Sequence, residues 1–343
     1  MSVRIVFAGT PEPALPTLEA LISSPHEVVG VITRSPAKSG RGRHLVPSPI
    51  AQRASEAGID LFETSSLKGD EALDRIRAWN ADIAVVVAYG ALIPLRVLEA
   101  LPHGWLNLHF SDLPFFRGAA PVQWAILSGL NETASSVFQL EEGLDTGPVF
   151  SRKKVEIADQ TSGELLDEMA RLGAQQVVDV VNAIEAGQAL AQPQVVPEGV
   201  ELSYARRLEP SDGAVSFDES ARQTWLRIRA VIPSPGAYTE FRGQRLKLGK
   251  VSLTDVPTPG PGRLIVSKKS VLVGCTDFCL ELGQVAPAGQ KWMDAAAWAR
   301  GARLDSDVRL REGIALGWQL TVIPMDIVPS VKRILVAKLP LRS

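Results

Sequence analysis

The sequence is poor in the residues that build metal centres and disulfide frameworks. Its 343 residues include only two cysteines and four histidines. His26, His44 and His103 are scattered along the chain, so no group of histidines and cysteines has the spacing of zinc ligands, and we expect no bound metal. Cys275 and Cys279 share the run VLVGCTDFCLEL, whose alternation is typical of a strand. Packed thiols are therefore favoured over a disulfide or a metal pair.

We also expect no leader and no membrane-spanning segment, and the sequence has no dinucleotide fingerprint. A strand pattern, VRIVFAG, begins after two residues, which leaves no room for a secretory signal or transit peptide. The apolar C-terminal stretch is interrupted too often by prolines and charges for a transmembrane helix. The first strand ends in FAGTP and not in G-x-G-x-x-G, which argues against a dehydrogenase. We expect a protein of the reducing cytoplasm with no membrane partner.

The formal net charge of −2 hides an uneven distribution. Residues 1–205 carry 15 Lys and Arg against 25 Asp and Glu, whereas residues 206–343 carry 21 against 13. The C-terminal part is therefore a candidate surface for a polyanion, and a solvated basic face is the alternative. Between residues 227 and 250, Glu240 is the only acidic residue among six basic ones: Arg227, Arg229, Arg242, Arg245, Lys247 and Lys250.

Strand and helix patterns alternate in the first part of the chain. The apolar runs RIVFAG, EVVGVIT, DIAVVVA and GWLNLHF are typical of buried strands, and LPTLEALISS and DEALDRIRAWN are typical of helices. This alternation predicts an α/β fold with a doubly wound, mostly parallel sheet. A long helix is expected from the capping-box pair Thr161 and Glu164 to about Gly187, followed by a linker over residues 186–201.

Short strand patterns with glycine and proline turns follow the linker. RLKLGKVSL, GRLIVS and SVLVGCTDFCLEL are the clearest of them. Their spacing predicts a small β-barrel or sandwich as a second domain.

Asn107 and His109 stand at the end of an expected strand in the stretch NLHFSDLPFFRGAAPVQ. Side chains two residues apart on a strand share a face, so an amide and an imidazole point into one space. Ligands of doubly wound sheets bind at the carboxyl ends of the strands. Taken alone, His109 is an ordinary core or loop histidine and Asn107 a strand-end cap, so the hypothesis depends on the pair.

Asp145 stands in a turn between Gly143 and Gly147, where a single aspartate commonly bonds its own backbone. Together with Asn107 and His109 it completes a set that suits carbonyl transfer. An amide N–H and an imidazolium can hold the oxygen of a tetrahedral intermediate, and a carboxylate can accept the proton of an attacking amine. No residue stands out as a covalent nucleophile, so direct transfer is the simpler scheme.

Five motifs occur in an order that resembles the methionyl-tRNA formyltransferase family. They are FAGTP, GRGRHLVPSPI, VVVAYGALIP, NLHFSDLPFFRGAAPVQ and EEGLDTG. Further on, SYARRLEPSDGAVSF and RIRAVIPSPGAYTEFRGQRLKL resemble the start of the family's C-terminal domain, so the resemblance covers roughly residues 3–312. It implies a Rossmann-like formyltransferase domain over 1–205, a small OB-like β-barrel that binds tRNA over 206–312, and a tail of unknown role over 313–343.

The resemblance implies transfer of the formyl group of 10-formyltetrahydrofolate, the co-substrate, to the amino group of methionine on initiator tRNA. Asn107 and His109 would polarise the formyl carbonyl, and Asp145 would manage the amine proton. We expect a cytoplasmic, bacterial-type monomer. The residues that match the family's folate contacts are Tyr89, Gly90, Ala91, Leu92, Ile93, Ser111, Asp112, Leu113 and Pro114. Those that match its basic acceptor-stem loop are Lys38, Arg41 and Arg43.

Asp112 departs from the family, which usually has leucine there, so we expect its side chain to face solvent.

Two other classes of function remain open: an enzyme of small metabolites whose second domain mediates assembly, and an RNA-binding protein that has lost the reaction. The GRG loop and the charge split disfavour the first, and the complete Asn107, His109 and Asp145 set disfavours the second. Met-tRNA, glycinamide ribonucleotide and an amino sugar nucleotide, offered as acceptors with 10-formyltetrahydrofolate, would separate these classes.

The tail gives a first testable prediction. Because no counterpart of the tail is found beyond residue 312, a chain ending at Gly313 should fold and keep the formylation rate of the full chain. Circular dichroism and a Met-tRNA formylation assay on both chains check this. A truncated chain that fails to fold would show that the tail is part of the structural core.

Overall fold

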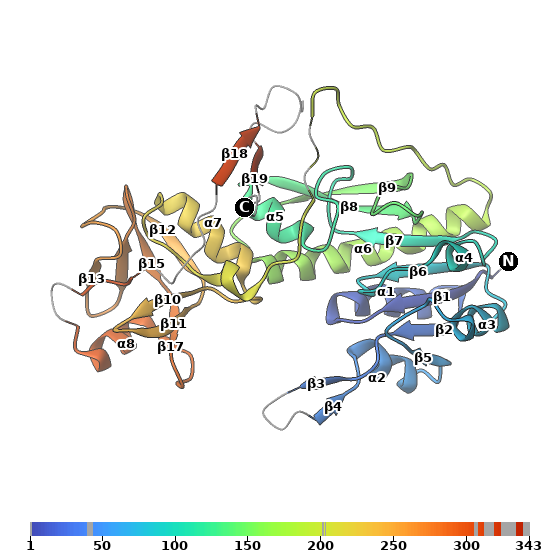
Figure 1. The fold of residues 1–343 in the computed structure, drawn as a ribbon, viewed down its shortest axis with the longest axis horizontal. Helices are drawn as coiled ribbons and strands as arrows, with labels where there is room; N and C mark the ends of the chain where they lie inside the picture. Colours follow the sequence, from blue (N-terminus) through green and yellow to red (C-terminus); the bar gives the residue numbers. More distant parts are fainter. Residues whose placement is uncertain are drawn as a thin grey trace, which may run out of the picture. The chain divides into compact units, whose positions relative to one another are not determined.

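The computed structural model describes residues 2–39, 44–200, 202, 204–304, 308–311, 319–323 and 334–338. The chain forms two compact units (Figure 1). The first unit comprises Met1–Gly118, Glu132–Val155 and Leu166–Tyr204. The second unit comprises Ala119–Asn131, Glu156–Leu165 and Ala205–Ser343. Two short stretches of the N-terminal half therefore belong to the second unit, and the predicted boundary at residue 205 stays a prediction.

A seven-stranded sheet forms the centre of the first unit, with the strand order β5-β2-β1-β6-β7-β8-β9. The neighbours from β5 to β7 pair in parallel and β8 runs antiparallel to β7, so the mostly parallel sheet is confirmed. The strands are β1 (Arg4–Gly9), β2 (Glu27–Thr33), β5 (Leu61–Glu63), β6 (Ile83–Val87), β7 (Trp105–His109), β8 (Glu132–Gln139) and β9 (Val149–Glu156). A separate hairpin consists of β3 (Ala37–Ser39) and β4 (His44–Val46).

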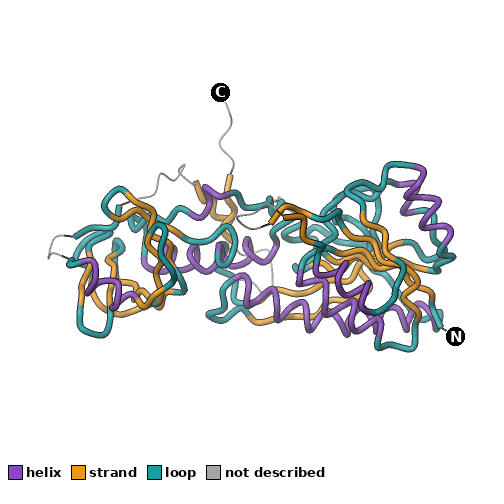
Figure 2. Tube along the Cα trace, turned by 90° about the horizontal axis from the view of Figure 1, so that it is seen from below, coloured by secondary structure: helices purple, strands orange, loops and turns teal. Residues whose placement is uncertain are grey.

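Helices of the first unit lie beside the strands of its sheet (Figure 2). These helices are α1 (Leu15–Ile22), preceded by a 3-10 turn at Glu12–Ala14, α2 (Pro49–Glu56), α3 (Asp70–Ala78), α4 (Leu95–Leu98) and most of α6 (Ser162–Glu185). Apolar side chains of α3 and α4, among them Ile76 and Val97, form one buried cluster with Val6, Val86 and Trp105 of the sheet. Within the described residues, no helix is both long and apolar enough to cross a membrane.

The start of α6 follows from its sequence. The Thr161 N–H donates to the Glu164 carboxylate at 2.7 Å, and the Glu164 N–H donates to Thr161 Oγ1 at 3.3 Å, which is the predicted capping box. The hydrogen bond from the Thr161 N–H lowers the pKa of Glu164. This reciprocal pair satisfies two backbone donors at the N-terminus of the helix, and α6 ends at Glu185, close to the predicted end.

The described ladders of the second unit form two four-stranded antiparallel sheets and no closed barrel. Their orders are β10-β11-β16-β17 and β12-β15-β14-β13. The strands are β10 (Tyr238–Phe241), β11 (Gln244–Leu248), β12 (Val251–Pro257), β13 (Leu264–Val266), β14 (Val271–Gly274), β15 (Phe278–Leu282), β16 (Gln284–Pro287) and β17 (Met293–Asp294). The unit also contains α5 (Pro121–Leu127), a 3-10 turn (Pro210–Gly213), α7 (Ala221–Val231) and α8 (Ala295–Ala302). The prediction of a second domain built of short strands is confirmed, and the described pairings of these strands are antiparallel.

Two details of the second unit differ from the sequence prediction. The run that contains Cys275 and Cys279 is a hairpin of β14 and β15 and not one strand, although both thiols are free and buried as expected. Burial raises the pKa of Cys275 to about 11.

Arg227 and Arg229 are buried, so they are not part of an exposed basic face. Arg229 donates to the carbonyls of Ala158 and Gln160.

The tail contributes two described strands, β18 (Gln319–Ile323) and β19 (Ile334–Lys338). They pair with each other in an antiparallel sheet of two strands. The remainder of the predicted 313–343 tail lies outside the described residues.

Candidate active site

Asn107 and His109 project from one face of β7, as their spacing predicts. Trp105 shares this face and is buried in the cluster beneath α4, where its indole N–H donates to the Val97 carbonyl at 2.9 Å. Leu108 points to the opposite face and packs on α6, so closely that a Cβ added to Gly173 would lie 2.7 Å from its Cδ2. Asn107 and His109 thus lie beyond the helix-covered part of their face, where loops replace helices.

A hydrogen bond through Nε2 orients the ring of His109. Nε2 lies 3.1 Å from the Phe116 carbonyl oxygen, which can only accept, so Nε2 must carry a proton. Nδ1 faces Asp145 Oδ2 at 3.9 Å, and both residues are 7% exposed. Because this separation exceeds a hydrogen bond, Nδ1 is the ring nitrogen that remains able to exchange a proton or bind a substrate atom.

Asp145 reaches His109 from the turn between β8 and β9. Its backbone is left-handed, with φ of 53°, a conformation that is uncommon for residues other than glycine. Oδ2 accepts the Gly118 N–H at 2.8 Å, which ties the carboxylate to the loop after β7. Gly147 closes the same turn so tightly that an added Cβ would lie 1.8 Å from the Gln139 carbonyl oxygen. The turn therefore places Asp145 through close backbone packing.

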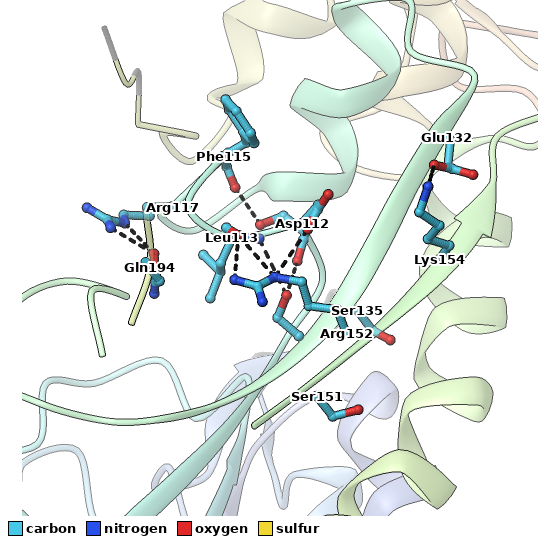
Figure 3. Close-up of polar contacts among 12 residues, drawn as sticks. Asp112, Leu113, Phe115, Arg117, Glu132, Ser135, Ser151, Arg152, Lys154 and Gln194 are labelled. Carbon is cyan, nitrogen blue, oxygen red and sulfur yellow. Dashed lines mark hydrogen bonds and ion pairs between the residues drawn. The ribbon is translucent and has the colours of Figure 1, made fainter. Parts of the chain in front are cut away.

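Two residues that the sequence did not single out complete this arrangement. The Gln194 amide donates to the carbonyls of Asp145 and Gly147, each at 2.8 Å. Its Oε1 accepts two hydrogen bonds from Arg117 (Figure 3). Gln194 lies in the predicted linker, which has no helix or strand of its own, and no local pattern marks it. Arg117 belongs to the stretch NLHFSDLPFFRGAAPVQ, but the sequence does not mark it as a site residue.

The loop after β6 lies at the point where the strand order reverses, between β1 and β6. Tyr89 is buried there, its hydroxyl donates to the Thr64 carbonyl, and burial raises its pKa to about 12. Arg34 donates to the Gly90 carbonyl at 2.6 Å. Ala91 and Ile93 are half-buried, and Leu92 is 78% exposed. The loop thus has an anchored start and an exposed tip.

The second predicted folate segment, Ser111 to Pro114, lies directly after β7. Ser111, Leu113 and Pro114 are buried, and the Ser111 hydroxyl donates to the Phe115 carbonyl at 2.6 Å. Asp112 faces solvent as expected, and its carboxylate lies 3.4 Å from Arg152 Nε. Arg152 also donates to the Leu113 carbonyl, as Figure 3 shows. This arginine neutralises the charge that the unusual aspartate adds and holds the segment on β9.

The predicted basic loop is largely beyond what the structure describes. Arg41 and Arg43 lie outside the described residues, and only the backbone of Lys38, in β3, is described. No group of three or more histidine, cysteine, aspartate or glutamate side chains suited to a metal ion occurs among the described residues.

The chain is similar in sequence to formyl transferases. A family model described as formyl transferase matches residues 3–181, and one described as formyl transferase, C-terminal domain, matches residues 207–303. The methionyl-tRNA formyltransferase of Thermobifida fusca (strain YX) is 47% identical over 309 residues, which cover 90% of this chain and 99% of that protein. The methionyl-tRNA formyltransferase of Salinispora tropica is 47% identical over 304 residues, 88% and 98% of the two proteins.

Among solved structures, the chain resembles HypX from Aquifex aeolicus in complex with tetrahydrofolic acid. The TM-score is 0.60 at 14% sequence identity, over 87% of this chain and 47% of that chain. This likeness concerns the fold alone.

The close packing at Gly147 gives a second prediction. Gly147→Ala should lower the free energy of unfolding by about 1–3 kcal/mol, because the new methyl group overlaps the Gln139 carbonyl and forces the turn to move. Gly69→Ala is the matched control, since an added Cβ there meets nothing within 4 Å. Urea unfolding of both variants measures the difference. Equal stability of the two would mean that the turn is not packed as described.

Proposed function

The chain belongs to the formyl transferase family, among the methionyl-tRNA formyltransferases, and on this premise we propose that Asn107, His109 and Asp145 carry out its reaction. The enzyme transfers a formyl group to the amino group of methionine on initiator tRNA, which supplies formylmethionyl-tRNA for translation initiation. We propose 10-formyltetrahydrofolate as the formyl donor and the cytoplasm as the place of the reaction.

The observation that carries this proposal is the orientation of the His109 ring. Nε2 is held by the Phe116 carbonyl, so Nδ1 faces the space that it shares with Asp145. The Asn107 side chain leaves the same face of the strand two residues earlier. Two donors on one face, next to one carboxylate, suit an oxygen that gains negative charge while a neighbouring nitrogen loses a proton.

Each of the three residues then has a defined task. The folate donor supplies a formyl group bonded to nitrogen, whose carbon is open to attack by an amine. Asn107 Nδ2 and, with the ring in its imidazolium form, His109 Nδ1 donate to the formyl oxygen as it becomes negative, and Asp145 accepts the proton that the attacking amine sheds. No protein nucleophile is needed, because the amine forms its bond to the formyl carbon directly. When the tetrahedral intermediate collapses, the bond between the formyl carbon and the folate nitrogen breaks, and that nitrogen leaves as tetrahydrofolate with the proton that Asp145 took from the amine.

Support for the folate site comes from the loop after β6. Within the described part of the chain, the backbone N–H groups of Gly90, Ala91 and Leu92 donate to no hydrogen bond. Unbonded donors at the switch point of a doubly wound sheet fit a ligand with ring nitrogens and a carbonyl, as a pterin has. We propose that Tyr89 to Ile93 hold the pterin and that Ser111 to Pro114 form the adjoining wall.

For the tRNA, we propose a grip shared by the basic loop and the second unit. Lys38, Arg41 and Arg43 belong to the loop, which contains no acidic residue between Arg34 and His44. The second unit adds four basic residues that are not buried: Arg242, Arg245, Lys247 and Lys250. On this proposal the chemistry belongs to residues 1–205, and the phosphate contacts are shared by the basic loop and residues 206–312.

Substitution of the three proposed catalytic residues is the third prediction. Asn107→Ala should lower kcat by about a hundredfold, because one donor to the developing oxyanion is lost, and leave folate binding largely unchanged. His109→Ala and Asp145→Asn should be at least as severe. Steady-state formylation of Met-tRNA and equilibrium binding of a folate analogue measure the two effects. A folded Asp145→Asn enzyme with the parent rate would refute the proposed mechanism.

The tRNA grip leads to the fourth prediction. Arg41→Ala should raise the KM for Met-tRNA severalfold without changing folate affinity, and the KM of the parent should rise steeply with salt because phosphate contacts release counterions. Arg77→Ala, at an exposed position of α3, is the control. An Arg41→Ala enzyme with the KM and salt dependence of this control would contradict a phosphate contact by Arg41.

A further inference from the structure

We propose that Gln194, held by Arg117, is a positioning residue that keeps the Asp145 carboxylate in place during formyl transfer. This inference rests on the proposed catalytic role of Asp145. Gln194 belongs to the segment between α6 and the second unit, and its side chain is partly buried. It touches no atom of the proposed reaction, so any effect on catalysis must pass through Asp145.

The orientation of the Gln194 amide is unambiguous. Arg117 offers only donors, and its Nε and Nη2 lie 3.1 and 2.7 Å from the same oxygen of Gln194. The carbonyls of Asp145 and Gly147 can only accept, and both lie 2.8 Å from the amide nitrogen. A flipped amide would set donor against donor and acceptor against acceptor. Both N–H groups of Gln194 are therefore committed to the Asp145 turn.

These contacts form a closed ring of hydrogen bonds around the catalytic carboxylate. The Arg117 side chain binds Gln194, Gln194 binds the Asp145 backbone, and Asp145 Oδ2 accepts the N–H of Gly118, the residue that follows Arg117. Figure 3 shows the contact between Arg117 and Gln194, which face each other. Because both ends of the ring meet at the Arg117–Gly118 peptide, it determines how far the Asp145 turn lies from the loop after β7.

The backbone of the turn explains why such a clamp is required. Asp145 has φ of 53°, and an aspartate in this region has the extended and right-handed conformations as alternatives. Hydrogen bonds to the carbonyls of residues 145 and 147 hold the 145–146 and 147–148 peptides, one on each side of the Thr146–Gly147 pair. Without them, Asp145 can leave the left-handed region and take its carboxylate away from His109. A displacement of 1 Å at a reacting group can cost a hundredfold in rate.

The segment that carries Gln194 is attached to the sheet independently. Gln192 forms a pair of backbone hydrogen bonds with Val149 at the start of β9. The side chain of Gln192 is exposed. Gln192→Glu thus changes the same residue type to the same charge in the same segment without touching the clamp, which makes it a matched control for Gln194→Glu.

Gln194→Glu in the full-length enzyme tests the proposal. A glutamate keeps the pairing with Arg117 but loses both N–H donors and sets a negative charge against two carbonyls. We expect kcat to fall about tenfold to a hundredfold, while the KM values for the folate donor and for Met-tRNA stay within about twofold. Gln192→Glu should show the parent kinetics. An unchanged kcat in folded Gln194→Glu overturns the proposal.

A double-mutant cycle separates positioning from a general structural role. If Gln194 acts through Asp145, adding Gln194→Glu to Asp145→Asn should lower kcat by no more than about a further twofold. A full additional loss in the double variant overturns positioning. Should Gln194→Glu fail to fold, Arg117→Lys replaces it in the same cycle, since lysine keeps the charge but cannot bind Oε1 with two nitrogens.

The cycle also tests the catalytic role of Asp145 and the positioning role of Gln194 separately. Parent activity in Asp145→Asn would mean that the catalytic role of Asp145 is wrong, whatever Gln194 does. Impaired Asp145→Asn together with unimpaired Gln194→Glu would leave that role intact and remove only the role of the clamp.

Discussion

The site depends on a turn that folds back across the sheet. β8 runs antiparallel to β7, so its last residue, Gln139, lies beside Leu106 near the start of β7. Asp145 follows Gln139 by six residues and nevertheless has to reach His109 at the other end of β7. Residues 140–147 must therefore return over the face from which Asn107 and His109 project. The close approach at Gly147, the left-handed Asp145 and the Gly118 hydrogen bond are consequences of this path.

Such a turn is stable because several hydrogen bonds hold it at once. A left-handed aspartate costs about 1 kcal/mol, and one neutral hydrogen bond contributes a similar amount. The Asp145 turn has two hydrogen bonds from Gln194 and one, to a carboxylate, from Gly118, so the strained backbone is outweighed. The same contacts that stabilise the turn orient the carboxylate, so on the proposed mechanism stability and catalysis are coupled at Asp145.

Local periodicity was enough to predict the elements that carry the site, but not the contacts that hold it together. Asn107 and His109 share a face because strands have a period of two, and the α6 capping box follows from Thr161 and Glu164. Gln194 could not be found, since its partners are backbone carbonyls some fifty residues away in an irregular turn. The burial of Arg227 and Arg229 was missed because charge counts carry no information on which face of α7 packs inward.

The central claim is that His109 holds a proton on Nε2 and presents Nδ1 to Asp145. The 15N chemical shifts of the enzyme labelled at histidine report the protonation of each ring nitrogen directly, and His109→Gln assigns the signals among only four histidines. For the neutral ring, the structure predicts a protonated Nε2, donating to the Phe116 carbonyl, and an unprotonated Nδ1. A neutral His109 ring with its proton on Nδ1 would contradict the account, since Nε2 could then make no hydrogen bond to that carbonyl.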